Sequence, residues 1–162
     1  VCVRLATGVG IGLVSLRGEK AAVKIQAIPA PRSGRVPLGQ VEDALRDIAR
    51  RYEVVDVSFD PYQFMRSAEL LEQGGLPMSE VPQRARRLAQ ATSTIWRYIS
   101  GGLLGHDGDP ELRSQVLGAR TKETIQGWHL DPAPGTAGLI AVAMALHEAT
   151  EVVPEPPAFI AL

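Results

Sequence analysis

The chain has 162 residues, of which 45% are hydrophobic and 22% charged, and its formal net charge is −1. These values predict one globular domain with a core of its own, and they argue against a strongly basic nucleic-acid binder. No apolar run reaches the roughly 18 residues that a membrane span requires. The single Cys2 excludes an intrachain disulfide and a cysteine-based zinc cluster. We therefore expect a cytoplasmic protein, and the initial Val1 in place of Met suggests a piece of a longer one.

The first part of the chain is predicted to form strands. Residues 1–6 (VCVRLA) are short and rich in β-branched side chains. Residues 8–18 and 19–28 resemble the two arms of a hairpin, turned at 17–20. Residues 29–39 (PAPRSGRVPLG) are rich in proline and glycine, which predicts a connection.

Three glycines near the start, Gly8, Gly10 and Gly12, raise the question of a dinucleotide-binding turn. In that motif the glycines open a helix, whereas a strand follows them here, so this interpretation is weak. The simpler interpretation is a turn with a β-bulge, where glycine is tolerated best.

An amphipathic helix is predicted after the connection. Its apolar residues recur at three- and four-residue spacings, which is typical of one buried helix face. These residues are Leu38, Val41, Ala44, Leu45, Ile48 and Tyr52. The acidic and basic residues between them predict a solvated outer face.

The next strand ends in a carboxylate. The β-prone run YEVVDVSF leads to Asp60, and Pro61 prevents the strand from continuing. An acid placed where a buried strand ends is typical of a residue that points into a site. A lone carboxylate does little chemistry, so its partners decide what the site can do.

Helices and shorter segments then alternate. Helices are predicted over residues 62–72 and 85–100, each followed by a Gly–Gly pair, with a short strand within 76–83. Asp109 is expected to cap a short helix that begins at Pro110, the helical position that tolerates proline best.

The last segments complete the order of elements. Residues 121–135 suggest an irregular strand and loop, and residues 136–150 are apolar nearly all round, which predicts a buried helix. Residues 151–162 contain three prolines and are predicted to form an extended tail after a domain of residues 1–150. Antiparallel strands followed by alternating helices and strands predict an α/β fold with a mixed sheet and helices on both faces. This is the order of the ribonuclease H-like fold, and the pattern alone leaves flavodoxin-like orders open.

Five segments, in this order, resemble the C-terminal nuclease domain of the large terminase subunit, the DNA-packaging protein of tailed bacteriophages. They are VSFDPYQF, GLPMSEVPQ, IWRYISGGLLGHDGDPELRSQV, KETIQGW and GLIAVAMALHEAT. The resemblance covers residues 38–150 and is more diffuse in the first strands. It implies a ribonuclease H-like endonuclease that cuts concatemeric viral DNA with magnesium or manganese ions held between acidic residues. Two metal ions can activate the attacking water and stabilise the leaving oxygen.

The resemblance also implies three metal-binding acids, of which one is present. Asp60 matches the acid at the end of the strand that follows the first helix, so it is the candidate catalytic and metal-binding residue. The first-strand acid aligns with Arg4 in CVRLA. The last-helix acid aligns with Ala137, and the adjacent Gly138 is equally unsuitable as a ligand. We therefore expect a degenerate site with impaired metal binding and impaired hydrolysis.

Arg4 is predicted to replace the metal by pairing directly with Asp60. A guanidinium suits this role because its planar fork matches a carboxylate in a bidentate arrangement. The alternative is that Arg4 points into solvent from an edge strand.

Other polar residues have less specific interpretations. Asp107 and Asp109 could be metal ligands at short spacing, but a turn and a helix cap explain them more simply. His129 is expected to be a half-buried structural histidine, and a phosphate contact is the alternative. His147 and Glu148 are expected to make surface contacts.

Basic residues on and after the third predicted helix are candidate DNA contacts. They are Arg84, Arg86, Arg87, Arg97 and Lys122. Arg84 and Arg87 are spaced to share one helix face, and Trp96 and Tyr98 follow within two turns. Such residues bind phosphates without sequence preference. The alternative is an ordinary solvated helix face.

These observations leave competing functions. The first is a terminase endonuclease with impaired activity. The second is a non-catalytic module that kept the nuclease fold and binds double-stranded DNA or a packaging partner, such as the portal or the small terminase subunit. A third is another ribonuclease H-like enzyme with metal ligands elsewhere. The sequence has no GxxxxGK[ST] phosphate loop, so this chain lacks that route to ATP hydrolysis.

Overall fold

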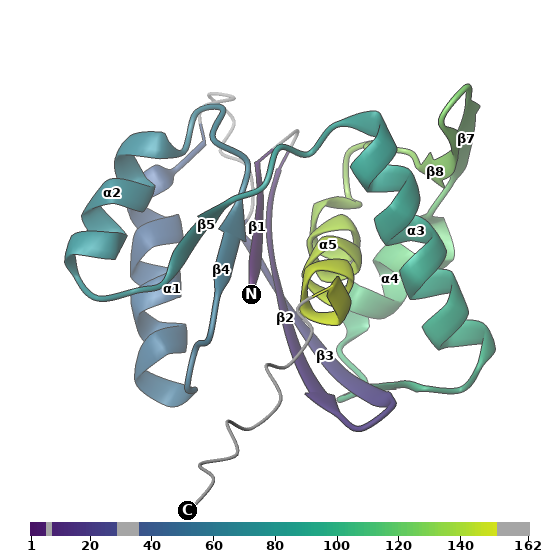
Figure 1. Ribbon diagram of the computed structural model, residues 1–162, viewed down its shortest axis with the longest axis horizontal. Coiled ribbons are helices and arrows are strands. Elements are labelled where there is room, and N and C mark those ends of the chain that lie inside the picture. The colour runs from purple at the N-terminus through teal and green to yellow at the C-terminus, as the bar shows by residue number, and fades with distance from the viewer. Residues whose placement is uncertain (6–7, 29–35, 152–162) are drawn as a thin grey trace, which may run out of the picture.

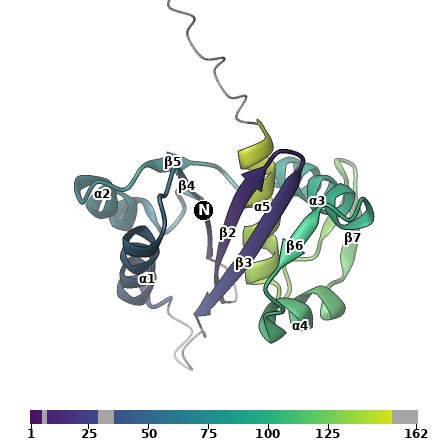
Figure 2. The same cartoon turned by 90° about the horizontal axis from the view of Figure 1, so that it is seen from below.

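A mixed sheet forms the centre of the computed structural model, which describes residues 1–5, 8–28 and 36–151. Its strand order is β5-β4-β1-β2-β3-β6 (Figures 1 and 2). The strands are β1 (Cys2–Leu5), β2 (Val9–Arg17), β3 (Lys20–Ile28), β4 (Val57–Phe59), β5 (Met78–Glu80) and β6 (Leu104–His106). The strands β1, β2 and β3 are antiparallel neighbours, whereas β4 is parallel to β1, β5 to β4, and β6 to β3.

Helices cover both faces of this sheet, as predicted. They are α1 (Leu38–Arg51), α2 (Met65–Gln73), α3 (Ala85–Ser100), α4 (Pro110–Gly118) and α5 (Ala137–Glu151). Figure 1 shows α1 and α2 on one side of the sheet and α3, α4 and α5 on the other. None of the helices in the described part of the chain combines the length and apolarity needed to cross a membrane. The helix α5 continues to Glu151, and the rest of the predicted tail, residues 152–162, lies outside the described residues.

Each face of the sheet has its own hydrophobic core. The core under α1 and α2 includes Val3, Ile11, Val41, Leu45 and Phe64. The core under α3, α4 and α5 includes Cys2, Val23, Leu88, Ile95 and Met144. Neighbouring residues of a strand point to opposite faces, so β1 sends Val3 into the first core and Cys2 into the second. This alternation decides which side of the sheet each later residue faces.

The glycines of β2 allow α5 to pack directly on the strand. A Cβ atom on Gly10 would lie 2.3 Å from the carbonyl carbon of Ala137, and one on Gly12 would lie 2.3 Å from the backbone nitrogen of Val142. The register of β2 with β1 and β3 runs without a bulge. Both earlier interpretations, the dinucleotide turn and the bulge, are therefore wrong: at Gly10 and Gly12 the backbone of α5 leaves no room for a side chain.

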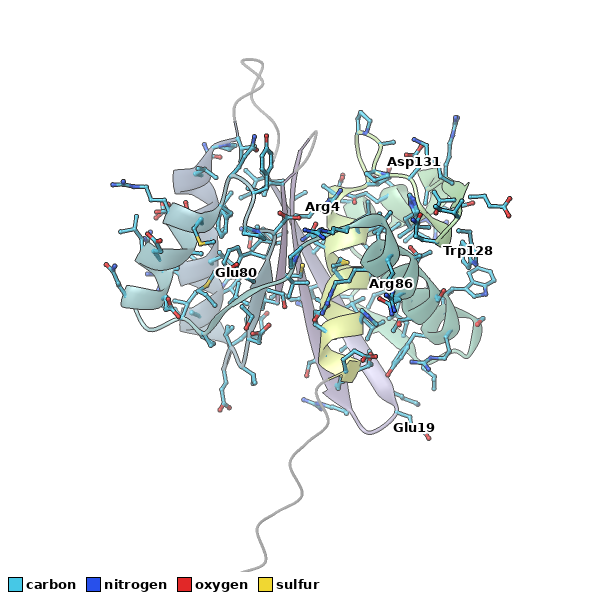
Figure 3. All side chains as sticks on the ribbon, turned by 45° about the horizontal axis from the view of Figure 1, so that its top comes forward. Arg4, Glu19, Glu80, Arg86, Trp128 and Asp131 are labelled. Atoms are coloured by element: carbon cyan, nitrogen blue, oxygen red, sulfur yellow. The ribbon has the colours of Figure 1, made fainter. Side chains whose placement is uncertain are left out.

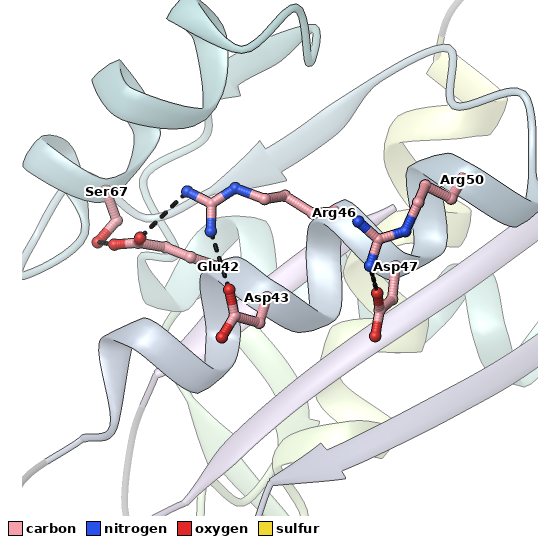
Figure 4. A network of polar contacts seen from close by, with 6 residues as sticks. All are labelled: Glu42, Asp43, Arg46, Asp47, Arg50 and Ser67. Carbon is pink, nitrogen blue, oxygen red and sulfur yellow. Dashed lines mark hydrogen bonds and ion pairs between the residues drawn. The ribbon is translucent and has the colours of Figure 1, made fainter.

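Ion pairs cover the outer face of α1, where charged residues were predicted. Arg46 contacts Asp43 at 3.0 Å and Glu42 at 3.4 Å, and Arg50 pairs with Asp47 (Figure 4). This network of polar contacts extends to α2, because the hydroxyl of Ser67 donates a hydrogen bond to Glu42 at 2.8 Å. This last contact joins the two helices of this layer.

Some local predictions fail. The strand β4 is shorter than the β-prone run, and Tyr52, expected on the buried face of α1, is 46% exposed. The strand β6 was not predicted. Instead of an irregular strand and loop, β7 (Thr121–Thr124) and β8 (Gly127–Leu130) form a separate hairpin against α3. There the ring of Trp128 meets that of Trp96 edge to face, at 6.3 Å between centroids.

Candidate functional site

The strand register brings Arg4 and Asp60 together at the ends of β1 and β4. Val3 lies beside Phe59, and Arg4 and Asp60 are the next residues of these parallel strands. Phe59 and Val3 belong to the core under α1, so Arg4 and Asp60 face the layer of α3 and α5. On its other side Arg4 pairs with Gly10, which lies against Ala137. The three positions that the resemblance assigned to metal-binding acids therefore converge.

Asp60 holds two backbone segments in place. Its Oδ1 accepts a hydrogen bond from the backbone N–H of Tyr62 at 2.9 Å. Its Oδ2 accepts one from the backbone N–H of Gln83 at 2.8 Å. The carboxylate thus joins the turn after β4 to the segment that leads into α3.

Gln83 lies between Arg4 and Asp60 and contacts both. Its Oε1 accepts a hydrogen bond from Nη1 of Arg4 at 2.5 Å, and its Nε2 donates to the carbonyl of Val3 at 3.0 Å. Arg4 and Asp60 form no salt bridge, so the predicted direct ion pair is wrong. The alternative is wrong as well, because β1 lies inside the sheet between β4 and β2 and is not an edge strand.

Sequence reasoning did not identify Gln83. It belongs to the segment GLPMSEVPQ, which carried part of the resemblance, but glutamine is not a ligand that divalent metal ions prefer. Its position immediately before the arginines of α3 was the one available signal. Its role depends on a contact with β1, about eighty residues earlier in the chain, which one sequence does not reveal.

Arg4 carries its charge into a partly buried setting. Burial lowers the pKa of its guanidinium, and the neighbouring Cys2 and Asp60 act in the opposite direction. An arginine remains protonated at neutral pH in any protein environment. Its Nε is enclosed and has no hydrogen-bond partner. Beneath it, burial raises the pKa of Cys2 to about 12, so this residue is a neutral thiol.

The residues at this site do not fit a divalent metal ion. Magnesium requires several oxygen ligands around one point. In the described ranges, no group of three or more histidine, cysteine, aspartate or glutamate residues could hold a metal ion. Asp60 is the one acid among the three converging positions, and Arg4 adds a positive charge. Glu80 on β5 is no substitute, because it lies opposite Phe59 and therefore faces the other side of the sheet.

The candidate DNA contacts fall into two groups. Arg87 and Lys122 are paired: Arg87 binds Glu148 of α5 through Nε at 2.8 Å and Nη2 at 2.5 Å, and Lys122 binds Asp131 at 2.8 Å. The hydrogen bonds to Glu148 raise the pKa of Arg87. Arg84 and Arg87, predicted to share one helix face, have different surroundings, because Arg87 turns towards α5 and pairs with Glu148 there, whereas Arg84 is exposed.

The second group remains exposed. Arg84, Arg86 and Arg97 form no salt bridge with another residue of the described segments. Arg84 occupies the cap position of α3, directly after Gln83, and Arg97 lies over the ring of Tyr98 at 5.7 Å. Figure 3 shows Arg86 on α3 and Arg4 between the sheet and the helices α3 and α5. We call Arg84, Arg86 and Arg97 the exposed arginines of α3.

The remaining candidates have structural roles. Asp109 caps α4 as predicted, accepting from the N–H groups of Glu111 and Leu112 at 2.7 and 2.9 Å. Asp107 pairs with Lys24 at 3.2 Å.

Both later histidines are buried. His129 has its Nδ1 2.8 Å from the carbonyl of Leu130. His147 has its Nδ1 3.2 Å from the hydroxyl of Thr94. The expected surface contacts of His147 and Glu148 are wrong, because α5 turns both residues towards α3.

The six-stranded mixed sheet, covered by helices on both faces and with its candidate site at the ends of β1 and β4, is the ribonuclease H-like fold of phage terminase nucleases. The chain is similar to the large terminase of bacteriophage HK97, with a TM-score of 0.76 and 17% identity, over 91% of this chain and 38% of that one. It therefore spans well under half the length of the HK97 protein.

Separately solved nuclease domains show the same likeness. The large terminase nuclease of the thermophilic phage G20c has a TM-score of 0.59 and 14% identity, over 90% of this chain and 89% of that one. The same nuclease with bound magnesium gives 0.57 and 16%, over 90% and 88%. No protein-family model and no curated protein matches the chain. At such identities the comparisons establish the fold, and the predicted resemblance to terminase nuclease domains is confirmed at that level.

Proposed function

We propose that this domain binds double-stranded DNA during viral genome packaging and does not hydrolyse it at the Asp60 site. The observation that carries this proposal is the contact of Gln83 with both Arg4 and Asp60, at the position where the resemblance requires metal-binding acids. Ala137, which has no carboxylate, lies with its backbone against Gly10, the register partner of Arg4. The resemblance implies DNA cleavage, whereas the side chains at the site support DNA binding.

The side chains around Asp60 support the lack of hydrolysis. Cleavage of a phosphodiester by two metal ions needs carboxylates that hold both ions. Asp60 alone supplies one carboxylate, and both its oxygens already accept backbone N–H groups. Magnesium or manganese would have to bind beside the guanidinium of Arg4, which repels it.

The exposed arginines of α3 support DNA binding. They present positive charge that is not neutralised by a salt bridge to any described residue. Arginine contacts to phosphates give affinity without sequence preference and make binding sensitive to salt. We expect modest affinity, because the chain as a whole has a net charge of −1.

The proposal is tested by combining two assays on the same preparation. The domain is incubated with supercoiled plasmid in magnesium or manganese, and DNA binding is measured by gel retardation at increasing salt. We expect salt-sensitive retardation without nicking. Nicking that Asp60→Asn abolishes, in a variant shown to be folded, would establish an active nuclease at this site. Nicking that survives Asp60→Asn would place a catalytic centre elsewhere.

The setting follows from this function. We propose the cytoplasm of the host cell as its location, with a phage or a prophage as its origin. The portal and the small terminase subunit are the protein partners that packaging would supply. Pull-down of the domain with each purified partner tests these contacts separately from DNA.

A further inference from the structure

Arg4 has hydrogen-bonding capacity that the described residues of the chain do not use. Nη1 of its guanidinium donates to Gln83, and Nε is enclosed without a partner. Nη2 forms no hydrogen bond with any residue of the described segments. The described residues therefore hold the guanidinium through Nη1 and leave Nη2 without a partner among them.

The surroundings favour an anion over a cation. Arg4 pairs with Gly10, which lies against the first residues of α5, so the positive end of that helix is adjacent. Arg84 is the residue after Gln83 and adds a further exposed charge. The opposing charge is that of Asp60, whose two oxygens are occupied by the N–H groups of Tyr62 and Gln83.

We propose that Arg4 binds a phosphate oxygen of the DNA backbone through Nη2 of its guanidinium, so that the site takes an anion in place of metal ions. This inference rests on the proposed DNA binding and names a residue that performs it. Arginine is suited to the contact because its guanidinium remains charged and forms short, charge-assisted hydrogen bonds with phosphate. Gln83 is a positioning residue, since its side chain fixes Nη1 and thereby orients the rest of the guanidinium.

Salt dependence of DNA binding gives the decisive measurement. Each phosphate contact contributes about 0.9 to the slope of log K against log salt concentration. We expect Arg4→Gln to reduce that slope by about one, Arg4→Lys to retain most of it, and EDTA to have no effect on the wild-type protein. The matched control is Arg17→Gln, an exposed arginine at the turn of the β2–β3 hairpin, far along the sheet from Arg4. An unchanged slope in folded Arg4→Gln would overturn the proposal.

A second measurement separates this inference from the proposed function. Inorganic phosphate is titrated into the wild-type domain and into Arg4→Gln without DNA, and side-chain guanidinium resonances are followed by NMR. Saturable shifts that Arg4→Gln removes support an anion site, and their absence in the wild type overturns it. If the domain does not retard DNA at all, the proposed function fails, and the phosphate titration still decides the role of Arg4.

Discussion

Gly10 of β2 lies against the backbone of Ala137, the first residue of α5. A Cβ at Gly10 would meet the carbonyl carbon, the carbonyl oxygen and the next nitrogen at 2.3 to 2.4 Å. Real side chains do not approach backbone atoms so closely. The missing side chain of Gly10 therefore allows the start of α5 to pack directly on β2, beside the register partner of Arg4.

We expect Gly10→Ala and Gly12→Ala each to destabilise the domain by about 1–3 kcal/mol or more, since overpacked cores typically lose this much. Urea unfolding at equilibrium measures the change. The matched control is Gly8→Ala, because a Cβ at Gly8 would meet nothing within 4 Å and the change should stay within about 0.5 kcal/mol. Equal stability of the three variants would contradict the close packing of α5 on β2.

Gln83→Leu should destabilise the domain by about 1–3 kcal/mol. The substitution removes the hydrogen-bond partners of Arg4 and of the Val3 carbonyl and puts an apolar side chain of similar size in their place. Thermal or urea unfolding gives the value. The control is Gln90→Leu on α3, where the glutamine is exposed and the effect should be near zero. A neutral Gln83→Leu would show that these hydrogen bonds contribute little.

Restoring the two missing acids should create a metal site. In the double variant Arg4→Asp with Ala137→Asp, three carboxylates would converge, and we expect manganese binding by calorimetry and metal-dependent nicking of plasmid DNA. The three acids repel one another without metal, so the apo variant should be less stable than the wild type. Adding Asp60→Asn provides the control, and it should abolish both signals. A folded double variant that binds no manganese would contradict the convergence of these positions.

Cys2 should make stability fall at high pH. Its pKa is raised by burial to about 12, whereas an unfolded thiol ionises near pH 8.5. Its contribution is fully present below about pH 8.5 and is lost as the pH rises towards 12, at up to about 1.4 kcal/mol per pH unit. Urea unfolding between about pH 7.5 and 10.5 measures this slope. The control is Cys2→Ala, whose slope should be shallower, and identical slopes would refute a neutral buried thiol.

Arg86 and Arg87 are neighbours in sequence and should respond differently to substitution. Arg87→Gln should cost about 1 kcal/mol of stability, because it breaks the pair with Glu148, and Arg86→Gln should cost almost nothing. DNA binding should show the reverse order, since Arg86 is free to contact phosphate. A double-mutant cycle with Glu148→Gln isolates the pair. Greater loss of DNA binding in Arg87→Gln, at unchanged stability, would contradict this assignment.

The elements with strong local signals were predictable from the sequence. The hairpin turn between Arg17 and Lys20, the amphipathic α1, the Asp109 cap and the buried α5 follow from periodicity and capping chemistry, and all four are confirmed. The strand β6 was missed because its three residues include a glycine and carry no β-branched side chain. Its strand conformation comes from pairing with β3, which is a tertiary effect.

The candidate site was predictable in its positions and not in its contacts. The positions of strand ends and the resemblance predicted that Arg4, Asp60 and Ala137 lie close together. The register of β1, β2 and β4 agrees with this prediction. The partner of Arg4 could not be predicted from the sequence. Gln83 reaches the guanidinium because the segment before α3 crosses the end of β1, which is a tertiary contact. A pairing inferred from charge alone overlooks a neutral residue whose side-chain oxygen binds the arginine and whose backbone N–H binds the aspartate.

The edge-to-face pair of Trp96 and Trp128 contains both tryptophans of the chain. Intrinsic tryptophan emission therefore reports on the contact of the β7–β8 hairpin with α3. A small hairpin held at the periphery can detach before the sheet melts. Unfolding curves followed by tryptophan fluorescence and by far-ultraviolet circular dichroism should then separate, and the earlier fluorescence midpoint would measure the detachment of the hairpin from α3.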